Sequence, residues 1–188
     1  SDGTIVAIGA RSNDGNGNDS GHVRVYEWNN TSWTQLGGDI DGEAAGDQSG
    51  HSVSLSSDGS VVAIGGWYND ANGNNSGHVR VYEWDNTSWT QLGGDIDGEA
   101  AEDFSGYSVS LSSDGSIVAL GAPGNDGNGD GSGHVRVYEW NNTSWTQRGG
   151  GMHGEAAGGL ASEGGSLVSL FAAGALGAIG AQCNVVNG

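Results

Sequence analysis

The sequence predicts an all-β protein made of repeated antiparallel sheets, and three observations lead to that class. The chain repeats every 56 residues without a gap, as in SDGTIVAIGA from Ser1, SDGSVVAIGG from Ser57 and SDGSIVALGA from Ser113. Short apolar runs alternate with clusters of Gly, Asn, Asp and Ser, the residues of tight turns. The 38 glycines among 188 residues follow no collagen-like period, so many tight turns explain them.

Each unit begins with two expected strands joined by a turn. In the segment HSVSLSS (51–57), Val53 and Leu55 alternate with serines, which is the period of a half-buried strand. The following SDG favours a tight turn, because Asp bonds to nearby backbone and Gly tolerates a positive φ. The run SVVAIGG (60–66) is apolar throughout, which predicts a strand that is covered on both faces.

The second half of the unit predicts two further strands. The segment HVRVYEW (78–84) places alternate side chains on opposite faces, Val79, Val81 and Glu83 on one and His78, Arg80, Tyr82 and Trp84 on the other. A turn of the type DNT or NNT leads to a fourth strand, SWTQLGG (88–94). The segment DIDGEAAEDFSG that follows is expected to be a loop into the next unit.

Four antiparallel strands in a repeat of this length are typical of a β-propeller blade, so the fold class is an all-β, β-propeller-like array of four-stranded antiparallel blades with a 56-residue repeat. A linear β-solenoid is the competing architecture. The units are a partial blade (1–48, strands two to four), two complete blades (49–104 and 105–160) and a degenerate partial blade with the C-terminal tail (161–188).

This number of blades is too small for an ordinary closed ring, which has about four to eight. The chain is therefore expected to be a fragment, a subunit that closes with partners, or an open stack. In the tail, the stretch 165–181 matches 106–122 three residues out of register and supplies degraded first and second strands. That first strand could complete the N-terminal blade in the same chain or in a neighbouring one, and other copies of the chain or further blades of a longer chain are the expected partners.

The charge balance limits the classes of partner. Against 23 acidic residues the chain has 5 Arg and no Lys, for a formal charge of −18. Nucleic acid is bound through Lys and Arg contacts to phosphate, so we expect no nucleic-acid partner. The acidic surface suits cations, or adaptation to a salty medium. No apolar run is long enough to predict a membrane span, and the single cysteine, Cys183, has no internal disulfide partner.

One stretch carries a family resemblance. SGYSVSLSSDGSIVALGAPGNDGNGDGSGHVRVYEW (105–140) resembles an FG-GAP repeat, the blade type of integrin alpha-subunit propellers. SGYS (105–108) stands for the Phe-Gly element, GAP (121–123) for the Gly-Ala-Pro element and SGHVRVYEW (132–140) for the tyrosine-bearing strand. The likeness covers residues 1 to 160 well, and it is greatest to tandem repeats of large secreted and surface proteins of marine bacteria and algae. It implies an extracellular propeller for adhesion or ligand binding, and no enzyme.

The family's calcium loop, between the first two strands, has shrunk here to SSDG, which offers too few oxygens for the ion. The loop before the third strand instead carries Asp or Asn at alternate positions followed by Gly, the opening of a calcium loop. The sequence therefore predicts Ca²⁺ as a cofactor there, most strongly in the third loop, with the alternative that these residues only form the turn. The candidate ligands are Asp126, Asn128 and Asp130; Asp14, Asn16 and Asn18; and Asp70, Asn72 and Asn74. A second acidic segment, DIDGE (39–43 and 95–99), becomes GMHGE (151–155) in the third unit and is the weaker candidate.

Two other repeated features suggest binding. Tryptophans flank the turn between strands three and four and could stack on sugar rings, with cross-strand and blade packing as the alternative; they are Trp28, Trp33, Trp84, Trp89, Trp140 and Trp145. N-glycosylation sequons lie in the same turns, at Asn30, Asn86 and Asn142.

The in-phase His and Arg residues of the third strand (His22 and Arg24 and their equivalents) are interpreted as polar contacts between blades, with the DIDGE acids or the strand glutamates as partners of the arginine. The residues that do not repeat, such as His51, His153, Met152 and Cys183, make no recognisable catalytic triad.

The sequence thus predicts a non-enzymatic extracellular or cell-surface module with a structural or adhesive role. Two alternatives stay open at this point: a lectin-like module that binds glycans or surface proteins, and a fibre-forming subunit joined by strand addition between chains.

Overall fold

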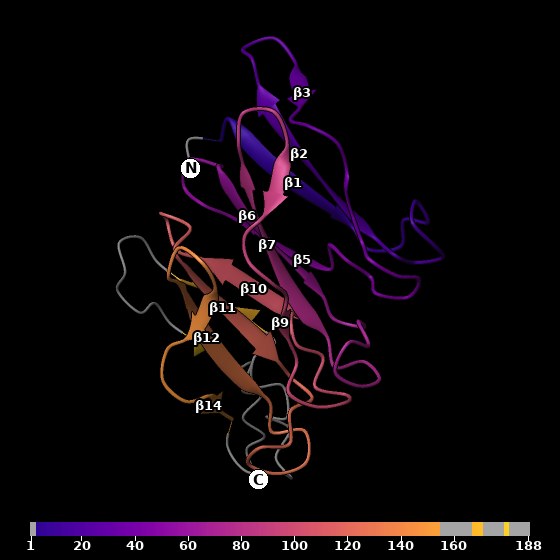
Figure 1. Ribbon diagram of the computed structural model, residues 1–188, viewed down its shortest axis with the longest axis vertical. Coiled ribbons are helices and arrows are strands. Elements are labelled where there is room, and N and C mark those ends of the chain that lie inside the picture. Colours follow the sequence, from indigo (N-terminus) through magenta and orange to yellow (C-terminus); the bar gives the residue numbers. More distant parts are fainter. Residues whose placement is uncertain (1–2, 155–166, 171–178, 181–188) are drawn as a thin grey trace, which may run out of the picture.

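The computed structural model describes residues 3–154, 167–170 and 179–180, and in this part of the chain the regular structure is β-strand. Three antiparallel sheets of one plan follow one another down the long axis of the molecule, the first sheet at the top of Figure 1 and the third at the bottom. No helix in the described part is long and apolar enough to cross a membrane. The predicted all-β, propeller-like array is confirmed.

The strands recur in phase with the 56-residue repeat. The first sheet holds β1 (Ile5–Ala10), β2 (His22–Trp28), β3 (Trp33–Gln35) and β4 (Ile40–Asp41). The second holds β5 (Ser52–Leu55), β6 (Val61–Gly66), β7 (His78–Trp84), β8 (Trp89–Gln91) and β9 (Ile96–Asp97). The third holds β10 (Ser108–Leu111), β11 (Ile117–Ala122), β12 (His134–Trp140), β13 (Trp145–Gln147) and β14 (Met152–His153). A two-stranded sheet joins β15 (Leu167–Val168) and β16 (Ile179–Gly180).

The SDG turn between the first two strands forms as its residues predict. Asp58 Oδ1 accepts the backbone N–H of Ser60 at 3.0 Å and the hydroxyl of Ser56 at 2.7 Å. Gly59 adopts a φ of 75°, in the left-handed region that favours glycine. The turn therefore sets the register in which Leu55 lies opposite Val62.

The fourth strand predicted at 88–94 is present but shorter, because β8 covers Trp89–Gln91. The prediction of a loop directly after it is wrong in one detail, because a further two-residue strand, β9, forms inside that segment. Both pieces pair with β7, β8 with its second half and β9 with its first residues. Between β8 and β9, Gly93 adopts a φ of 72°, and the edge strand is not paired with β7 at this point.

The sheets stack face to face, and each uses its two faces differently. We call the face that carries Ile8, Ile64 or Leu120 the leading face, and the opposite face, with Val25, Val81 or Val137, the trailing face. Because antiparallel partners share a face, Ile64 and Arg80 lie on the leading face together.

The core lies between these faces. The trailing face of the first sheet and the leading face of the second enclose one cluster, which contains Val23, Val25, Ile40, Val62, Ile64 and Tyr82. The trailing face of the second sheet and the leading face of the third enclose another, which contains Val61, Val79, Val81, Val118 and Leu120. All six residues of β6 are buried, as its unbroken apolar run predicts.

The first strand of a sheet lies against the first strand of the next, β5 beside β10 and β10 beside β15. Leu111 N donates to Ser54 Oγ at 2.9 Å, and Leu170 N repeats the bond to Ser110 Oγ at 2.8 Å. The strand predicted at 51–57 is half-buried, as its alternation indicates, whereas all four residues of the equivalent β10 are buried. Serines fit in these strands because the hydroxyls of Ser54 and Ser110 accept backbone hydrogen bonds from the next sheet.

The tail continues the array in the same chain. Val168 pairs with Ile179 as Val109 pairs with Leu120, in the out-of-register alignment read from the sequence. β15 lies against β10 and β11 of the third sheet and is therefore away from the N-terminal sheet. The possibility that this strand completes the N-terminal blade within one chain does not describe this structure.

Candidate functional site

The nine predicted calcium ligands lie in three exposed loops that precede the third strand of each sheet. In each loop the first Asp accepts the backbone N–H five residues later, for example Asp126 Oδ1 from Gly131 N at 2.7 Å. The first two loops make the same bond from Asp14 and Asp70. This is the hydrogen bonding of a turn.

The second residue of each loop fastens it to the chain beyond the edge strand. Asn16, Asn72 and Asn128 donate their side-chain N–H to the carbonyls of Gly42, Gly98 and Gly154 at 2.8–2.9 Å. Of the third residues, Asn74 donates to Glu102 Oε1 at 2.6 Å and Asn18 to Asp19 Oδ2 at 3.0 Å. The alternative reading, turn chemistry, accounts for these contacts, and calcium at the loops stays a prediction.

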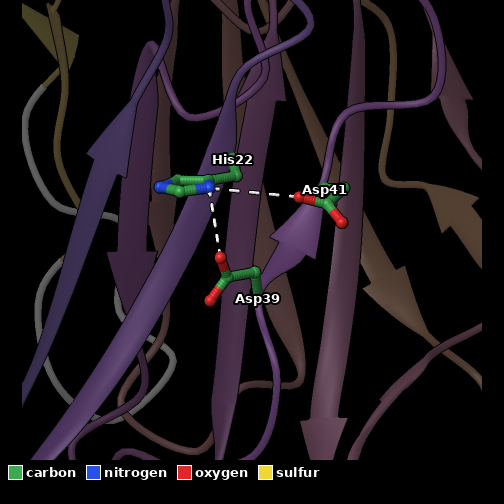
Figure 2. A group of neighbouring side chains, drawn as sticks. All are labelled: His22, Asp39 and Asp41. Atoms are coloured by element: carbon green, nitrogen blue, oxygen red, sulfur yellow. Dashed lines mark ion pairs between the residues drawn. The ribbon is translucent and has the colours of Figure 1, made fainter. Parts of the chain in front are cut away.

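Groups of His and acidic side chains that could hold a metal ion lie instead at the start of the third strand. In the first sheet, His22 of β2 points its Nδ1 between Asp39 and Asp41, 3.4 Å and 4.0 Å from their carboxylate oxygens (Figure 2). Arg24 donates two hydrogen bonds to the Asp39 carboxylate, from Nε at 2.8 Å and from Nη2 at 2.7 Å. These bonds, with one from Gln35, lower the pKa of Asp39 to about 2.

The equivalent group of the second sheet spans a blade junction. His78 Nδ1 lies 3.6 Å from Asp95 of its own sheet and 3.8 Å from Glu43, which belongs to the segment after the first sheet. Arg80 turns away from Asp95, because it reaches the carbonyl of Asp41 at 2.8 Å and the Ser49 hydroxyl at 3.4 Å across the junction. Its Nη1 also lies 3.8 Å from the second oxygen of Glu43.

The third group has a different composition. His134 Nδ1 lies 3.6 Å from Glu99, and Asp103 completes the group. Gly151 stands where the second unit has Asp95, and His153, whose ring centroid is 5.5 Å from that of His134, stands in place of Asp97. Burial lowers the pKa of His134, and the nearby Arg136 lowers it further.

The blade-to-blade role predicted for the His and Arg residues is confirmed for Arg80 and Arg136, and two DIDGE acids, Glu43 and Glu99, are their partners. Sequence reasoning missed that the same acids meet the histidines. The signal was present, because His and the DIDGE segment keep the same spacing in the first two units. The sequence of one repeat does not show, however, that the glutamate of the DIDGE segment contacts the histidine of the next unit.

The tryptophans form one tilted pair per sheet, with ring centroids 5.3–5.4 Å apart. Trp89 Nε1 donates to Leu36 O of the preceding sheet at 2.9 Å, and Trp145 Nε1 donates to Leu92 O at the same distance. Trp84 lies against Gly37, where an added Cβ would come within 2.7 Å of the ring. The pairs at the two junctions thus have the packing role given as the alternative, whereas Trp28 and Trp33 are exposed.

A cluster of half-buried aromatic rings that the sequence analysis did not single out lies between the second and third sheets. Trp67 stacks on Tyr68 and on His51, with centroids 4.0 Å and 4.6 Å apart, and meets Tyr107 edge-on at 5.2 Å. Phe104 lies 5.7 Å from Trp67. The signal was the replacement of the Gly-Ala-Pro element by GGWY in this unit alone.

The predicted glycosylation residues Asn30, Asn86 and Asn142 are exposed and occupy positive φ angles of 73–74° at the tips of the third turns. Asn tolerates this conformation better than most residues. The structure leaves these side chains accessible, and the modification itself stays a prediction.

Comparisons with known proteins agree with the fold. The family model of the FG-GAP repeat matches residues 40–82. A search among curated proteins finds no match. The crystal structure of a candidate 6-phosphogluconolactonase from Bacteroides fragilis is similar with a TM-score of 0.55 and 13% identity, over 82% of this chain and 37% of that one. The tricorn protease is similar with a TM-score of 0.41 and 11% identity, over 77% of this chain and 12% of that one.

This chain therefore spans little more than a third of the length of the Bacteroides fragilis protein. At 13% identity, the similarity shows the fold alone. The repeat match and the stacked antiparallel sheets agree with the resemblance carried by residues 105–140. The recognition from the sequence is therefore confirmed: residues 40–82 match the FG-GAP repeat, and the fold is β-propeller-like.

Proposed function

We propose that the chain is a non-enzymatic β-propeller module that builds or anchors an extracellular assembly, and that it does so by stacking against further blades. These blades belong to other copies of the chain or to further repeats of a longer protein. The module's location outside the cell follows the resemblance to surface-protein repeats and is part of the proposal.

The observation that carries the proposal is the leading face of the first sheet. The exposed large hydrophobic residues among the described part of the chain are Ile8, Trp28 and Trp33, and all three belong to this sheet. One repeat later, the equivalent Ile64 is 1% exposed and packs against the sheet before it. An apolar face that is covered at two junctions and open at the first is a surface for a further blade.

The repeated chemistry supports a structural role over a catalytic one. An active site is a unique constellation of groups, whereas the His, Arg and Trp positions here recur at each blade, and the Arg and Trp residues at the two junctions make the same contacts. The negative charge of a phosphorylated lactone would also be repelled by a chain that has a formal charge of −18 and no Lys. We therefore expect no hydrolysis of 6-phosphogluconolactone above the uncatalysed rate.

Sedimentation velocity over a concentration series tests the stacking. We expect concentration-dependent association, which Trp33→Glu should weaken because it places a charge in the open face. Thr34→Glu is the matched control, since this exposed neighbour points to the other face and adds the same charge. Association that is equal in both variants, or a monomer at every concentration, would contradict stacking between copies of the chain and leave further repeats of a longer protein as the source of the blades.

Negative-stain imaging with calcium and with a chelator tests two further parts of the proposal. Discs would indicate rings closed by several chains, and filaments would indicate a fibre subunit. If the chelator disperses either form and Asp126→Asn does the same, the third loop binds calcium; if neither has an effect, the loop is only a turn.

A second candidate function, carbohydrate binding, is favoured by the aromatic cluster around Trp67. Stacked rings with part of their faces open are the usual platform for sugars. A glycan array on the wild-type chain and on Tyr107→Ala tests it, because Tyr107 contacts Trp67 at the cluster's edge. Glycan binding that is lost in the variant would establish this function, and an empty array would remove it.

A further inference from the structure

We propose that the junction between the first and second sheets holds a divalent first-row transition-metal ion of the Zn²⁺ type, bound by Glu43, His78 and Asp95. The site goes beyond the proposed function, and it does not depend on whether the module associates. It also differs from the predicted calcium loops in place and in ligands.

The side chain of His78 is buried and unsatisfied. Its side chain is 1% exposed, and neither ring nitrogen has a hydrogen-bond partner in the described part of the chain. A buried polar group without a partner costs about 1–3 kcal/mol. An imidazole that is aimed at two carboxylates without bonding to either therefore points to a missing ligand between them.

The distances suit a metal better than a hydrogen bond. His78 Nδ1 lies 3.6 Å from Asp95 Oδ2 and 3.8 Å from Glu43 Oε2, beyond the range of a good N–H···O bond. Atoms that each lie about 2.0–2.1 Å from a tetrahedral zinc are about 3.3 Å from one another. Small side-chain movements would bring the three ligand atoms to that spacing.

The other oxygen of each carboxylate faces a different side chain. Gln91 Nε2 donates to Asp95 Oδ1 at 2.6 Å, which leaves Oδ2 toward His78. Arg80 Nη1 lies 3.8 Å from Glu43 Oε1, while Oε2 faces the same histidine. Partners of this kind orient the carboxylates of metal sites. The side chains of Glu43 and Asp95 are 45% and 25% exposed, so an ion can enter from solvent.

Comparison with the other two repeats explains why the middle junction is selected. In the first sheet, Arg24 bonds to both oxygens of Asp39, so an ion would have to compete there with a charged partner. In the third group, Gly151 replaces the aspartate, and Asp103 already accepts N–H bonds from Ala100 and Asn125. Among the described repeats, the second alone keeps a buried histidine with two carboxylate oxygens available.

The ligand set indicates the class of metal. Imidazole nitrogen with carboxylate oxygens suits Zn²⁺ and its neighbours, whereas Ca²⁺ takes six to eight oxygens. Glu43 follows the first sheet, and His78 and Asp95 belong to the second. A bound ion would therefore tie two blades together across their junction.

Isothermal titration of the full chain with Zn²⁺ alone, at physiological salt and with excess Ca²⁺ to occupy unspecific acidic sites, tests the proposal. We expect one ion per chain, and an affinity at least about tenfold lower in Asp95→Asn and in Glu43→Gln. Both substituted side chains are partly exposed and keep their size, so folding should be preserved. Asp39→Asn is the matched control and should leave the affinity unchanged.

Co²⁺ absorption gives a second readout, because a tetrahedral nitrogen-and-oxygen site has a visible spectrum that unspecific carboxylate binding lacks. The spectrum should disappear in His78→Ala and persist in Asp39→Asn. Zinc binding that is equal in the wild type and in Asp95→Asn, or no binding at all with Ca²⁺ in excess, would overturn the proposal.

Discussion

Ile8, Ile64 and Leu120 occupy the same position of the repeat, and the structure predicts very different effects when each is replaced by Ala. Ile64 and Leu120 are 1% and 0% exposed between stacked sheets, whereas Ile8 is 54% exposed on the open leading face. On one side the three positions have the same strand partner, the arginine of the third strand. On the other side Ile64 and Leu120 also lie opposite Val53 and Val109 of a first strand, a partner that Ile8 lacks among the described strands. Differences between Ile8→Ala and the other two variants therefore report the neighbouring sheet together with this first strand.

The expected magnitudes follow from burial. Truncation of a fully buried Ile or Leu to Ala costs about 2–5 kcal/mol, because apolar burial is lost and a cavity remains. An exposed position costs about 0.5 kcal/mol or less. For a chain of this length, a loss of about 3 kcal/mol lowers the melting temperature by roughly 6–12 °C.

Urea unfolding followed by tryptophan fluorescence measures these changes, with the same urea dependence required in all variants so that the midpoints are comparable. The order should be Ile64→Ala and Leu120→Ala strongly destabilised, and Ile8→Ala near the wild type. Equal losses at all three positions would refute the reasoning, because stacking would then contribute nothing beyond the sheet itself.

Three other changes test separate parts of the structure. Gly65→Ala should prevent stacking of the second and third sheets, because the new Cβ would lie 2.0 Å from Gly106 O; solubility and circular dichroism would show the loss. Bonds from the Ser112 hydroxyl and then from Ser116 lower the pKa of Asp114 to about 2, below its ordinary 3.8. The stability from the Asp114 carboxylate is thus present above pH 4 and is lost as the pH falls toward 2, and Asp114→Asn should flatten that part of the stability curve. Trp145→Phe should cost about 1 kcal/mol in urea unfolding through the lost bond to Leu92 O, and Trp33→Phe should cost less.

Much of the fold could be predicted from the sequence because each local pattern occurs in three successive repeats. The turn at Asp58 and Gly59, the buried run of β6 and the alternation of β7 are local properties of the chain, and all three are observed. The short strand β9 was missed because DIDGE reads locally as a loop, and only its pairing with β7 shows that the ladder resumes there.

The candidate site was harder to predict because it lies between units. Val53 and Leu55 alternate with serine, a local pattern that indicates one solvent-exposed face. In the structure the serine hydroxyls form hydrogen bonds to the next sheet, and these bonds depend on how the sheets stack. In the same way, His78 and Glu43 are 35 positions apart and meet through the stacking of two sheets. The loop asparagines show a different limit, because their spacing resembles a calcium loop while the contacts they make within the protein are those of a turn.

The central claim is that identical sheets stack leading face on trailing face, and an extended chain tests it most directly. Residues 57–112 placed ahead of Ser1 continue the repeat in register, because Ser1 is equivalent to Ser113. The added segment supplies a sheet to cover the leading face of the original first sheet, and its last residues supply a first strand like β10 to pair with β1. The decisive measurement is the cost of Ile8→Ala in urea unfolding of this extended chain. The account predicts that the cost rises from near zero to about 2–5 kcal/mol, as at Ile64; a cost that stays near zero would contradict the stacking.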